Sequence, residues 1–315
     1  MSASPHHLLL AILGPTASGK SRLAIALAEE LGGEVVSCDS TAVYRRFDIG
    51  TDKVPLVEQR GIPHHLVDVV EPTEAYSAAR YAREAASVVA DIVARGRLPV
   101  LAGGTGLYYR ALTRGLFPGP ARDEHLRTRL EAIAARRGVG FLHRMLSRVD
   151  PDSGRRIQPR DLKRIVRALE VFFLTGRPLT AHFAETVSPL AASEIVAIGL
   201  RIPADLTATR VARRVEEQFA RGLVDEVKGI LASGVPPTAH PFSGLVYRQV
   251  LEYLQGVRDE AATRALIVRE NRRYARRQLI WFRKEPNLQW LFTPGECRTT
   301  LDAARSVLSA RGLLR

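Results

Sequence analysis

Short apolar runs recur along the chain and are typical of buried strands. They lie at residues 8–13, 34–38, 98–102 and 193–202, and a weaker run at 63–69 ends near Glu71 and Pro72. Residues 76–95 carry apolar side chains at the i, i+3 and i+4 spacing of an amphipathic helix, and another helix follows the first run from about Arg22. Strands that alternate with helices favour a parallel sheet covered on both faces. We therefore expect an α/β fold.

The pattern changes near Pro118-Gly119-Pro120, beyond which residues 123–186 are almost wholly helical and rich in Arg. Strand character returns at 193, and further helices are predicted at 206–220, 223–233, 247–255 and 259–283. No pattern is informative after about Pro294. We expect three segments: a first part of the core (1–117), a helical insertion (118–190), and the rest of the core with basic C-terminal helices (191–315).

The junction of the first strand and helix matches the G-x-x-x-x-G-K-[ST] motif of a phosphate-binding loop, or P-loop. Its members are Gly14, Pro15, Thr16, Ala17, Ser18, Gly19, Lys20 and Ser21. Backbone amides and the helix N-terminus can surround phosphate oxygens, Lys20 adds a full positive charge, and the Ser21 hydroxyl can hold Mg²⁺. The sequence predicts a P-loop NTPase-like core that binds a di- or triphosphate.

Two further loops end predicted strands of the same sheet. Asp39 follows the second run, where open α/β sheets place ligands. Its carboxylate can bind Mg²⁺ or take a proton as a general base, and the alternative is a capping or turn Asp. Residues 103–106 (GGTG) either bring backbone amides to an anion or make a tight turn.

Charge adds a second class of ligand. The 315 residues include 46 Lys and Arg against 33 Asp and Glu, a net charge of +13, which favours nucleic acid or an anionic membrane surface as partner. The two cysteines, Cys38 and Cys297, lie far apart without metal-ligand spacing, as expected in a reducing cytosol. The first apolar run is too short to span a bilayer and leads directly into the P-loop, so no targeting segment or membrane partner is expected.

The basic residues gather in two places. Residues 269–284 (RENRRYARRQLIWFRK) place Arg on one side of a helix and Tyr274, Gln278 and Trp281 on another, an arrangement that suits RNA phosphates and stacked bases. A solvated face is the alternative, with Trp281 and Phe282 in the core. A similar cluster spans residues 155–167 in the insertion, and together the two suggest a clamp.

No single simple class accounts for these features. The chain has no N-K-x-D motif of a GTPase. A kinase of a small metabolite leaves the basic helices without a role, and a non-enzymatic RNA-binding protein leaves the P-loop and Asp39 without one. An enzyme that acts on RNA with a small diphosphate substrate uses all of them.

Several stretches together resemble the tRNA dimethylallyltransferases (isopentenylpyrophosphate:tRNA transferases), over residues 8–291. They are GPTASGKS (14–21), DSTAVYRRFDIGT (39–51), PHHLVDVVEP (63–72), YSAARY (76–81), LPVLAGGTGLYYRAL (98–112), RALEVF (167–172) and YARRQLIWFRK (274–284). The resemblance implies transfer of a dimethylallyl group from dimethylallyl diphosphate to the exocyclic amine of the adenosine 3′-adjacent to the anticodon. Mg²⁺ assists and diphosphate leaves. A cytoplasmic monomer that binds the anticodon stem-loop of tRNA is expected.

The resemblance also assigns roles to residues. Asp39 becomes the general base, with Thr16 and Arg214 on the diphosphate and Ser21 and Asp39 on Mg²⁺. From the residues alone, Arg214 could instead pair with Glu217 or Gln218 on a helix surface. The tRNA contacts implied are Asp39, Ser40, Thr41, Ala42, Thr105, Arg127, Lys163, Arg164, Ile165, Val166, Arg167, Ser243, Gly244, Leu245, Val246, Tyr247, Arg248 and Arg276.

Three positions depart from the family pattern. DIGTDKV at 48–54 stands where DIGTAKP is usual, so that Asp52 and Val54 are unusual. Val246 stands where a Gly usually precedes the Tyr, and Ala42 where many members have Gln. None of these is expected to touch the diphosphate site.

Overall fold

The computed structural model describes residues 7–117 and 119–313, and these form two compact units. The core unit comprises residues 1–112 and 192–315, and the helical unit comprises 113–191. The boundaries therefore fall at 112/113 and 191/192, where the sequence suggested 117/118 and 190/191. Pro118, which the sequence marked as a boundary residue, lies outside the described residues. No described helix is long and apolar enough to cross a membrane.

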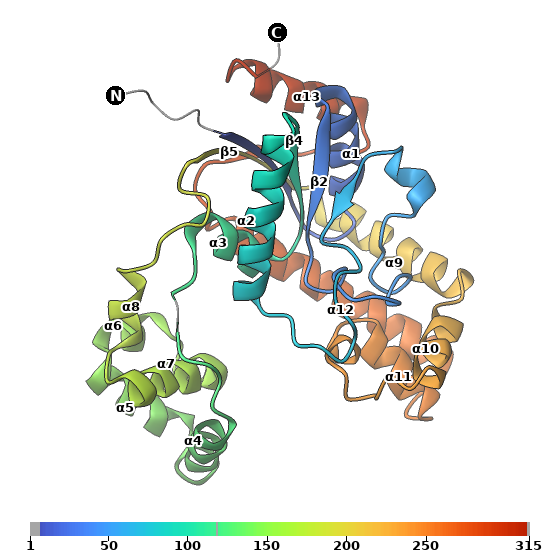
Figure 1. Ribbon diagram of the computed structural model, residues 1–315. Coiled ribbons are helices and arrows are strands. Elements are labelled where there is room, and N and C mark those ends of the chain that lie inside the picture. The colour runs from blue at the N-terminus through green and yellow to red at the C-terminus, as the bar shows by residue number, and fades with distance from the viewer. Residues whose placement is uncertain (1–6, 118, 314–315) are drawn as a thin grey trace, which may run out of the picture. The chain divides into compact units, whose positions relative to one another are not determined.

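The core unit is built on a six-stranded parallel sheet with strand order β3-β2-β4-β1-β5-β6 (Figure 1). Its strands are β1 (His7–Leu13), β2 (Gly33–Cys38), β3 (His64–His65), β4 (Leu98–Gly103), β5 (Ser193–Leu200) and β6 (Leu288–Leu291). Strand β3 is shorter than the predicted run at 63–69, because Leu66 and Asp68 adopt positive φ angles of 59° and 55° and end the extended backbone.

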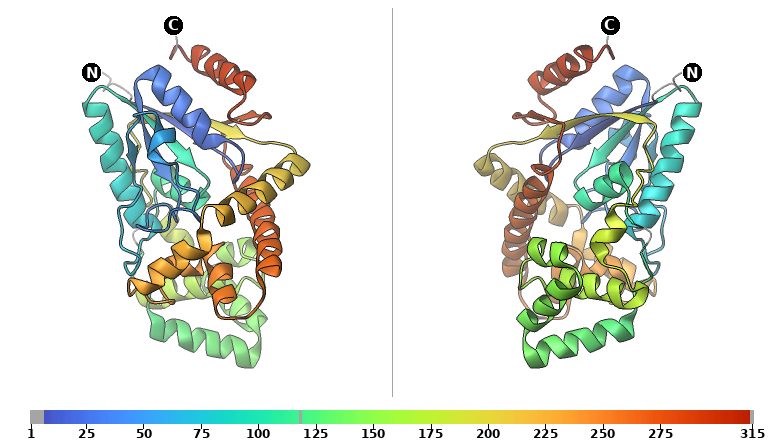
Figure 2. Two further views of the ribbon diagram at one scale, coloured as in Figure 1. Left: turned by 90° about the vertical axis from the view of Figure 1, so that its right-hand side faces the viewer. Right: turned by 90° about the vertical axis from the view of Figure 1, so that its left-hand side faces the viewer.

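Helices cover both faces of this sheet (Figure 2). Helix α1 (Lys20–Leu31) packs beside α13 (Arg298–Ser309) on one face, and α2 (Ala78–Ala94) contacts β2 and β4 from the other. Leu23 and Leu27 of α1 join Leu10 and Ile198 of the sheet in one fully buried core cluster. Burying each such side chain contributes about 1.5–3 kcal/mol, so this cluster fixes α1, and the loop before it, on the sheet.

Helices α9 (Ala204–Ala220), α10 (Leu223–Ala232), α11 (Tyr247–Leu254) and α12 (Glu260–Phe282) lie beyond the carboxyl ends of the central strands (Figure 1). The core unit also contains α3 (Gly106–Arg114) and the short 3₁₀ helices η1 (Leu56–Gln59) and η2 (His240–Ser243). Helix α12 packs against α9 and α11. Helix α13 lies in the stretch after Pro294 where no pattern was informative, and strand β6 lies before it, at residues for which no element was predicted.

The helical unit consists of short helices around its own core. They are α4 (Glu124–Arg137), α5 (Val139–Val149), α6 (Pro151–Arg156), α7 (Leu162–Thr175) and α8 (Leu179–Phe183). Leu142 and Leu146 of α5 pack with Leu169 of α7, and all three are fully buried. This unit therefore does not depend on the sheet for its apolar core.

Candidate active site

The P-loop connects β1 to α1 with the backbone that its glycines allow. Gly19 has φ 85° and precedes α1 without a side-chain cap, so the first amides of the helix have no side-chain acceptor. A Cβ at Gly19 would lie 2.7 Å from the Gly295 amide nitrogen, which excludes any other residue. Lys20 and Ser21, the first two residues of α1, line a pocket at this helix end. Such a helix N-terminus attracts anions.

Residues distant in sequence hold the P-loop in place. Gln278 of α12 accepts a hydrogen bond from the Thr16 amide (2.8 Å) and donates one to the Gly104 carbonyl (2.9 Å). Arg210 of α9 donates to the Ala17 carbonyl (2.7 Å), and the Gly295 amide donates to the Ser18 carbonyl (2.9 Å). The loop is thus preorganised by the helices beyond the strand ends.

Arg214 reaches the P-loop from the neighbouring turn of α9. Its Nη1 donates to the Thr16 hydroxyl (2.7 Å), and its Nε lies 2.5 Å from Oδ2 of Asp52. The alternative of a helix-surface pair does not hold, because it is the adjacent Arg213 that meets Glu217 (3.3 Å). Arg214, Thr16 and Lys20 therefore line one pocket.

Lys20 carries an unusual proton affinity in this setting. Desolvation of its ammonium, together with the positive charge of Arg214, lowers the pKa of Lys20 to about 8, against the opposite effects of Asp39 and Asp52. Additional negative charge from a bound ligand would favour the protonated form.

The pocket itself has a volume of about 330 Å³. Its polar lining includes Thr16, Lys20, Ser21, Asp39 and Arg214, and valine side chains supply apolar surface. These valines are Val35, Val54, Val67, Val211, Val215 and Val246. Charged groups and apolar surface in one cavity suit a ligand with an anionic head and an apolar tail.

Asp39 is held by the turn that follows β2. Its Oδ1 accepts hydrogen bonds from the Thr41 amide (2.8 Å) and the Thr41 hydroxyl (2.7 Å). The adjacent Ser40 amide donates to the Thr105 hydroxyl (3.1 Å). The turn geometry considered from sequence is therefore present, and the carboxylate lines the pocket as well.

The glycines of the GGTG turn are explained by close packing. A Cβ at Gly103 would lie 2.1 Å from the Cys38 carbonyl oxygen, and one at Gly106 would overlap the Trp281 ring. Of the two interpretations of this turn, the contacts support tight backbone packing that brings Thr105 beside Ser40.

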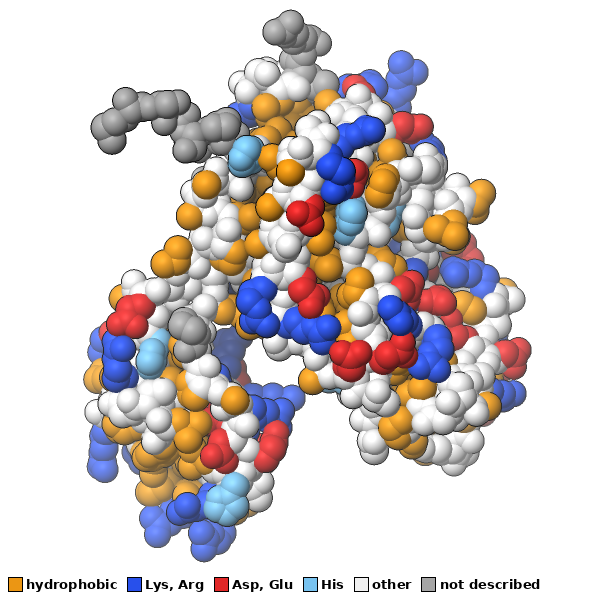
Figure 3. Space-filling view, in the orientation of Figure 1, with side chains coloured by type: hydrophobic (Ala, Val, Ile, Leu, Met, Phe, Trp, Pro, Cys, Tyr) orange, Lys and Arg blue, Asp and Glu red, His pale blue; other side chains and the backbone are white. Residues whose placement is uncertain are grey.

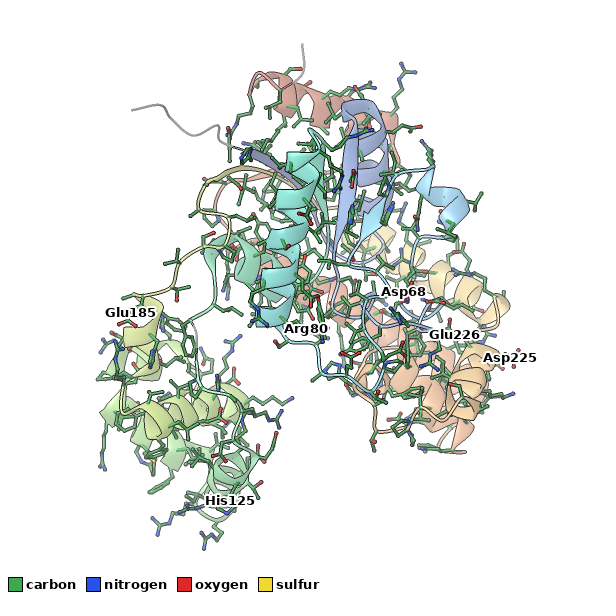
Figure 4. All side chains as sticks on the ribbon, viewed as in Figure 1. Asp68, Arg80, His125, Glu185, Asp225 and Glu226 are labelled. Atoms are coloured by element: carbon green, nitrogen blue, oxygen red, sulfur yellow. The ribbon has the colours of Figure 1, made fainter. Side chains whose placement is uncertain are left out.

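A carboxylate from α10 holds the loop around residues 48–54, which follows the turn at Asp39. Glu226 Oε2 accepts from the Asp48 and Ile49 amides (3.0 and 2.7 Å), and its Oε1 accepts from the Tyr247 hydroxyl (2.6 Å). Figure 4 labels Glu226 in this region of the core unit. The contact with Asp48 and Ile49 positions residues 50–54, which line the pocket.

A metal ion would find oxygen ligands here. No cluster of three or more His, Cys, Asp or Glu side chains suited to a metal occurs in the described part of the chain. Ser21, Asp39 and Asp52 nevertheless place a hydroxyl and carboxylates on one pocket wall. Mg²⁺ binds through a few such oxygens and keeps waters and substrate phosphates as its other ligands, so this donor set fits it.

Residues 243–248, expected to contact tRNA, differ in their exposure. Gly244, Leu245 and Val246 line the pocket, whereas Ser243 and Arg248 are exposed. The Tyr247 side chain is buried, and its hydroxyl is bound by Glu226 and the Gly50 amide, so its role is to hold the loop. Val246 has φ 75° and ψ −63°, a strained conformation that explains why Gly is usual at this position.

The basic cluster of the helical unit separates into two groups. Lys163 and Arg164 are exposed on α7, and Figure 3 shows Lys and Arg side chains on the surface of this unit. Ile165 and Val166 are buried in the helical unit's core, so their side chains are not available to RNA, contrary to the expectation for these positions.

Arg127 and Arg167 form the second group, because a buried carboxylate binds both. Glu170 accepts hydrogen bonds from Arg127 Nε (2.8 Å) and Arg167 Nη1 (2.6 Å), and its side chain has no exposed surface. Arg127 therefore links α4 to α7, whereas Arg167 pairs with Glu170 within α7 and donates to the Pro120 carbonyl (3.0 Å).

Helix α12 likewise divides its predicted contacts. Tyr274 and Gln278 line the pocket, and Arg276 is exposed. Trp281 instead packs on Gly106 with the Arg110 guanidinium 4.7 Å from its ring centroid, and Phe282 is fully buried. The interpretation of Trp281 and Phe282 as core residues agrees with these contacts better than base stacking does.

Several pocket residues were not singled out as site residues from the sequence. Gln218 and Lys53 line the cavity, and Arg210 donates to the P-loop backbone. Asp52, which was expected to stay clear of the diphosphate site, instead pairs with Arg214 in the pocket. The others become visible only when α9 and α12 are placed against the strand ends.

Known proteins share both the sequence and this architecture. The IPP transferase family model matches residues 42–285. The tRNA dimethylallyltransferase of Solibacter usitatus is 49% identical over 283 residues, 90% of this chain and 92% of that protein. That of Koribacter versatilis is 43% identical, over 96% and 98% of the two chains.

Solved structures agree with these sequence relatives. The full-length tRNA isopentenylpyrophosphate transferase of Bacillus halodurans superposes with a TM-score of 0.72 and 36% identity, over 97% of this chain and 96% of that one. A eukaryotic dimethylallyltransferase acting on tRNA gives a TM-score of 0.79 and 25% identity, over 97% and 79%. The chain belongs to the IPP transferase family.

Proposed function

We propose that this protein transfers a dimethylallyl group from dimethylallyl diphosphate to the exocyclic amine of the adenosine 3′-adjacent to the anticodon in tRNA. As a member of the family, the chain is a tRNA dimethylallyltransferase. The observation that supports the proposed chemistry most strongly is that the Asp39 carboxylate, the Lys20 ammonium of the P-loop and the Arg214 guanidinium line one cavity.

The diphosphate supplies much of the donor's affinity. Burying a five-carbon tail at about 0.8 kcal/mol per carbon yields roughly 4 kcal/mol, which corresponds to about millimolar binding. Lys20, the Thr16 hydroxyl and Arg214 offer the additional charge and hydrogen bonds. The valines of the pocket, such as Val211 and Val215, offer the apolar surface for the tail.

These same groups act on the transition state. As the allylic C–O bond breaks, negative charge grows on the leaving diphosphate, and preorganised cations stabilise it. Because Gln278 and Arg210 already hold the loop, little reorganisation is needed when this charge develops.

Asp39 takes the proton that the adenine amine loses when its nitrogen forms the new bond to carbon. Oδ1 is occupied by Thr41, which leaves Oδ2 to accept the proton. General-base removal of this kind is typically worth about 10²–10⁴ in rate.

Mg²⁺ is proposed as the cofactor, held by Ser21 and Asp39 and by the diphosphate. When bound, it would neutralise charge on the leaving group. The hydroxyl and carboxylate oxygens on the pocket wall support this assignment.

The anticodon stem-loop is the proposed part of tRNA that binds. The target adenine must leave its stack, at a cost of a few kcal/mol, to reach a cavity at the strand ends. Exposed basic residues, among them Lys163, Arg164, Arg248 and Arg276, offer contacts to RNA phosphates that would offset this cost. We propose a cytoplasmic monomer as the acting form, as the resemblance to the family implies.

Incubation of the protein with tRNA and radiolabelled dimethylallyl diphosphate tests this proposal. Label is expected in the RNA, to be lost when Lys20 is replaced by Ala and retained in the matched Arg22→Ala variant, whose cation is exposed on the same helix. ATP-dependent phosphorylation of a small metabolite, with no label in RNA, would instead support a P-loop kinase.

A further inference from the structure

Asp52 occupies an unexpected place among the cations of the pocket. Its Oδ2 lies 2.5 Å from Arg214 Nε and its Oδ1 lies 3.7 Å from Arg221 Nη1. It lines the same cavity as Lys20, and its side chain is only 24% exposed. The DIGTAKP pattern to which this stretch was compared has Ala at this position, and this chain has a carboxylate there.

Arg214 is shared between this carboxylate and the P-loop. One nitrogen donates to the Thr16 hydroxyl, and another meets Asp52. A guanidinium presents its donors in a fixed fork. An anion bound at Thr16 and Lys20 must therefore either compete with Asp52 for the donors of Arg214 or lie close to the negative charge of Asp52.

The backbone keeps Asp52 close to the pocket. Its amide donates to the Ile49 carbonyl (3.2 Å), within the stretch that Glu226 holds. The next residue, Lys53, bonds the Tyr44 carbonyl (2.6 Å) and the carboxylates of Asp48 (2.6 Å) and Asp68 (2.5 Å). These contacts fix the backbone on both sides of Asp52, so its carboxylate stays near Arg214 when another anion binds.

We propose that Asp52 is a resident anion that competes with the diphosphate for Arg214, weakening diphosphate binding and speeding release of the diphosphate product. This inference rests on the proposed function of the pocket as a diphosphate site. It makes Asp52 a residue that tunes affinity for the donor and the product, through Arg214, without taking part in proton transfer.

Calorimetric titration with inorganic diphosphate in the presence of EDTA tests the competition directly. Asp52→Asn keeps an acceptor for Arg214 and removes the charge, and Asp52→Ala restores the usual family residue. Both variants are expected to bind diphosphate about fivefold more tightly than the parent chain, a gain typical of removing one partly exposed like charge. Product inhibition by diphosphate during turnover is expected to strengthen by the same factor.

The matched control is Glu217→Ala. It removes one negative charge from α9, the helix that carries Arg214, but Glu217 pairs with the exposed Arg213. Its diphosphate affinity is expected to change less than twofold. Unchanged or weaker diphosphate binding by Asp52→Asn would overturn the inference. Weaker binding of Mg²⁺ by Asp52→Asn in a parallel titration would also overturn the inference, since that result would make Asp52 a metal ligand.

The same titration separates this inference from the function on which it rests. If the parent chain binds no diphosphate, or binds it equally well after Lys20→Ala, the proposed donor site itself fails. If the parent chain binds diphosphate through Lys20 while the Asp52 variants match it, only the competition fails.

Discussion

The helical unit and the pocket of the core unit differ in which residues adopt positive φ angles. In the helical unit, Asp123, Asp150 and Asp161 cap helices with their side chains, and the described residues with positive φ are glycines. At the pocket, Asp52 and Val246 have positive φ, as does Ala17 of the P-loop. All eight described non-glycine residues with positive φ lie in the core unit, and Asp52 and Val246 are the two of them that line the pocket.

Arginine side chains show the same division. Arg127 and Arg167 converge on the buried Glu170, so their charges are used to stabilise the fold. Arg214 instead meets a hydroxyl and a partly exposed carboxylate at the wall of a cavity, where a ligand can reach it. Clusters of Arg in a sequence therefore do not by themselves indicate a binding surface.

Replacing Glu170 with Gln tests the structural half of this comparison. Two arginines would lose the charge that they share, and the free energy of unfolding is expected to fall by about 3 kcal/mol, measured by urea denaturation. The control Glu185→Gln disrupts an exposed pair with Arg177 and should leave the free energy of unfolding nearly unchanged. Equal losses in the two variants would contradict the assignment.

The same variant carries a pH signature. Burial would raise the pKa of Glu170, but hydrogen bonds from Arg127 and Arg167 outweigh it and lower the pKa to about 2. A carboxyl whose pKa is lowered on folding stabilises the protein above its unfolded pKa of about 4.5, and this contribution is lost as pH falls toward 2. The stability gap between the parent chain and Glu170→Gln should therefore narrow over that range.

The pH dependence of kcat/KM for dimethylallyl diphosphate tests the role of Lys20 in the pocket. Because the pKa of Lys20 is lowered to about 8, its ammonium loses its proton as pH rises through that value. We expect kcat/KM for dimethylallyl diphosphate to fall up to about tenfold per pH unit above pH 8. Lys20→Arg should remove this decline, since arginine stays charged. A decline of the same size in Lys20→Arg would assign it to another group.

Salt dependence of tRNA binding distinguishes exposed from buried cations. Lys163→Ala and Arg164→Ala should each reduce the slope of log affinity against log salt concentration by about one. Arg127→Ala should lower stability and change that slope less, because Glu170 already pairs with its guanidinium. A tRNA affinity that does not depend on salt concentration in the parent chain would contradict binding of RNA phosphates by these basic residues.

Strain at the pocket predicts the smallest effect. Val246→Gly loses a buried side chain but relieves a conformation that costs about 1–3 kcal/mol, so stability should change by no more than about 1 kcal/mol. Val250→Gly, a fully buried position within the same helix, has no strain to relieve and should cost about 3 kcal/mol. Equal costs at the two positions would argue against strain at Val246.

The sequence predicted what local patterns determine. The apolar runs located β1, β2, β4 and β5, the helical character of residues 123–186 located the helical unit, and the P-loop motif located a turn whose residues Thr16, Lys20 and Ser21 line the pocket. Asp39 was expected beside that loop because parallel strands end at one edge of a sheet.

Long-range contacts escaped prediction for physical reasons. Gln278 lies 262 residues from the amide that it holds, and nothing local marks an amide side chain as a clamp. The Ile165 and Val166 positions were grouped with their basic neighbours, although the helical period turns them into the core. Strand β6 is short and lies at the sheet edge, where few residues carry the pattern.

The most direct test of the account is the turnover of Asp39→Asn. Asparagine keeps an oxygen acceptor for the Thr41 amide and hydroxyl, so the turn should persist, while the basic oxygen is lost. Single-turnover transfer of the dimethylallyl group to tRNA is expected to slow by about 10²–10⁴, with tRNA and diphosphate affinities within a few-fold of the parent chain. A variant that transfers the group at a rate within threefold of the parent would contradict proton removal by Asp39.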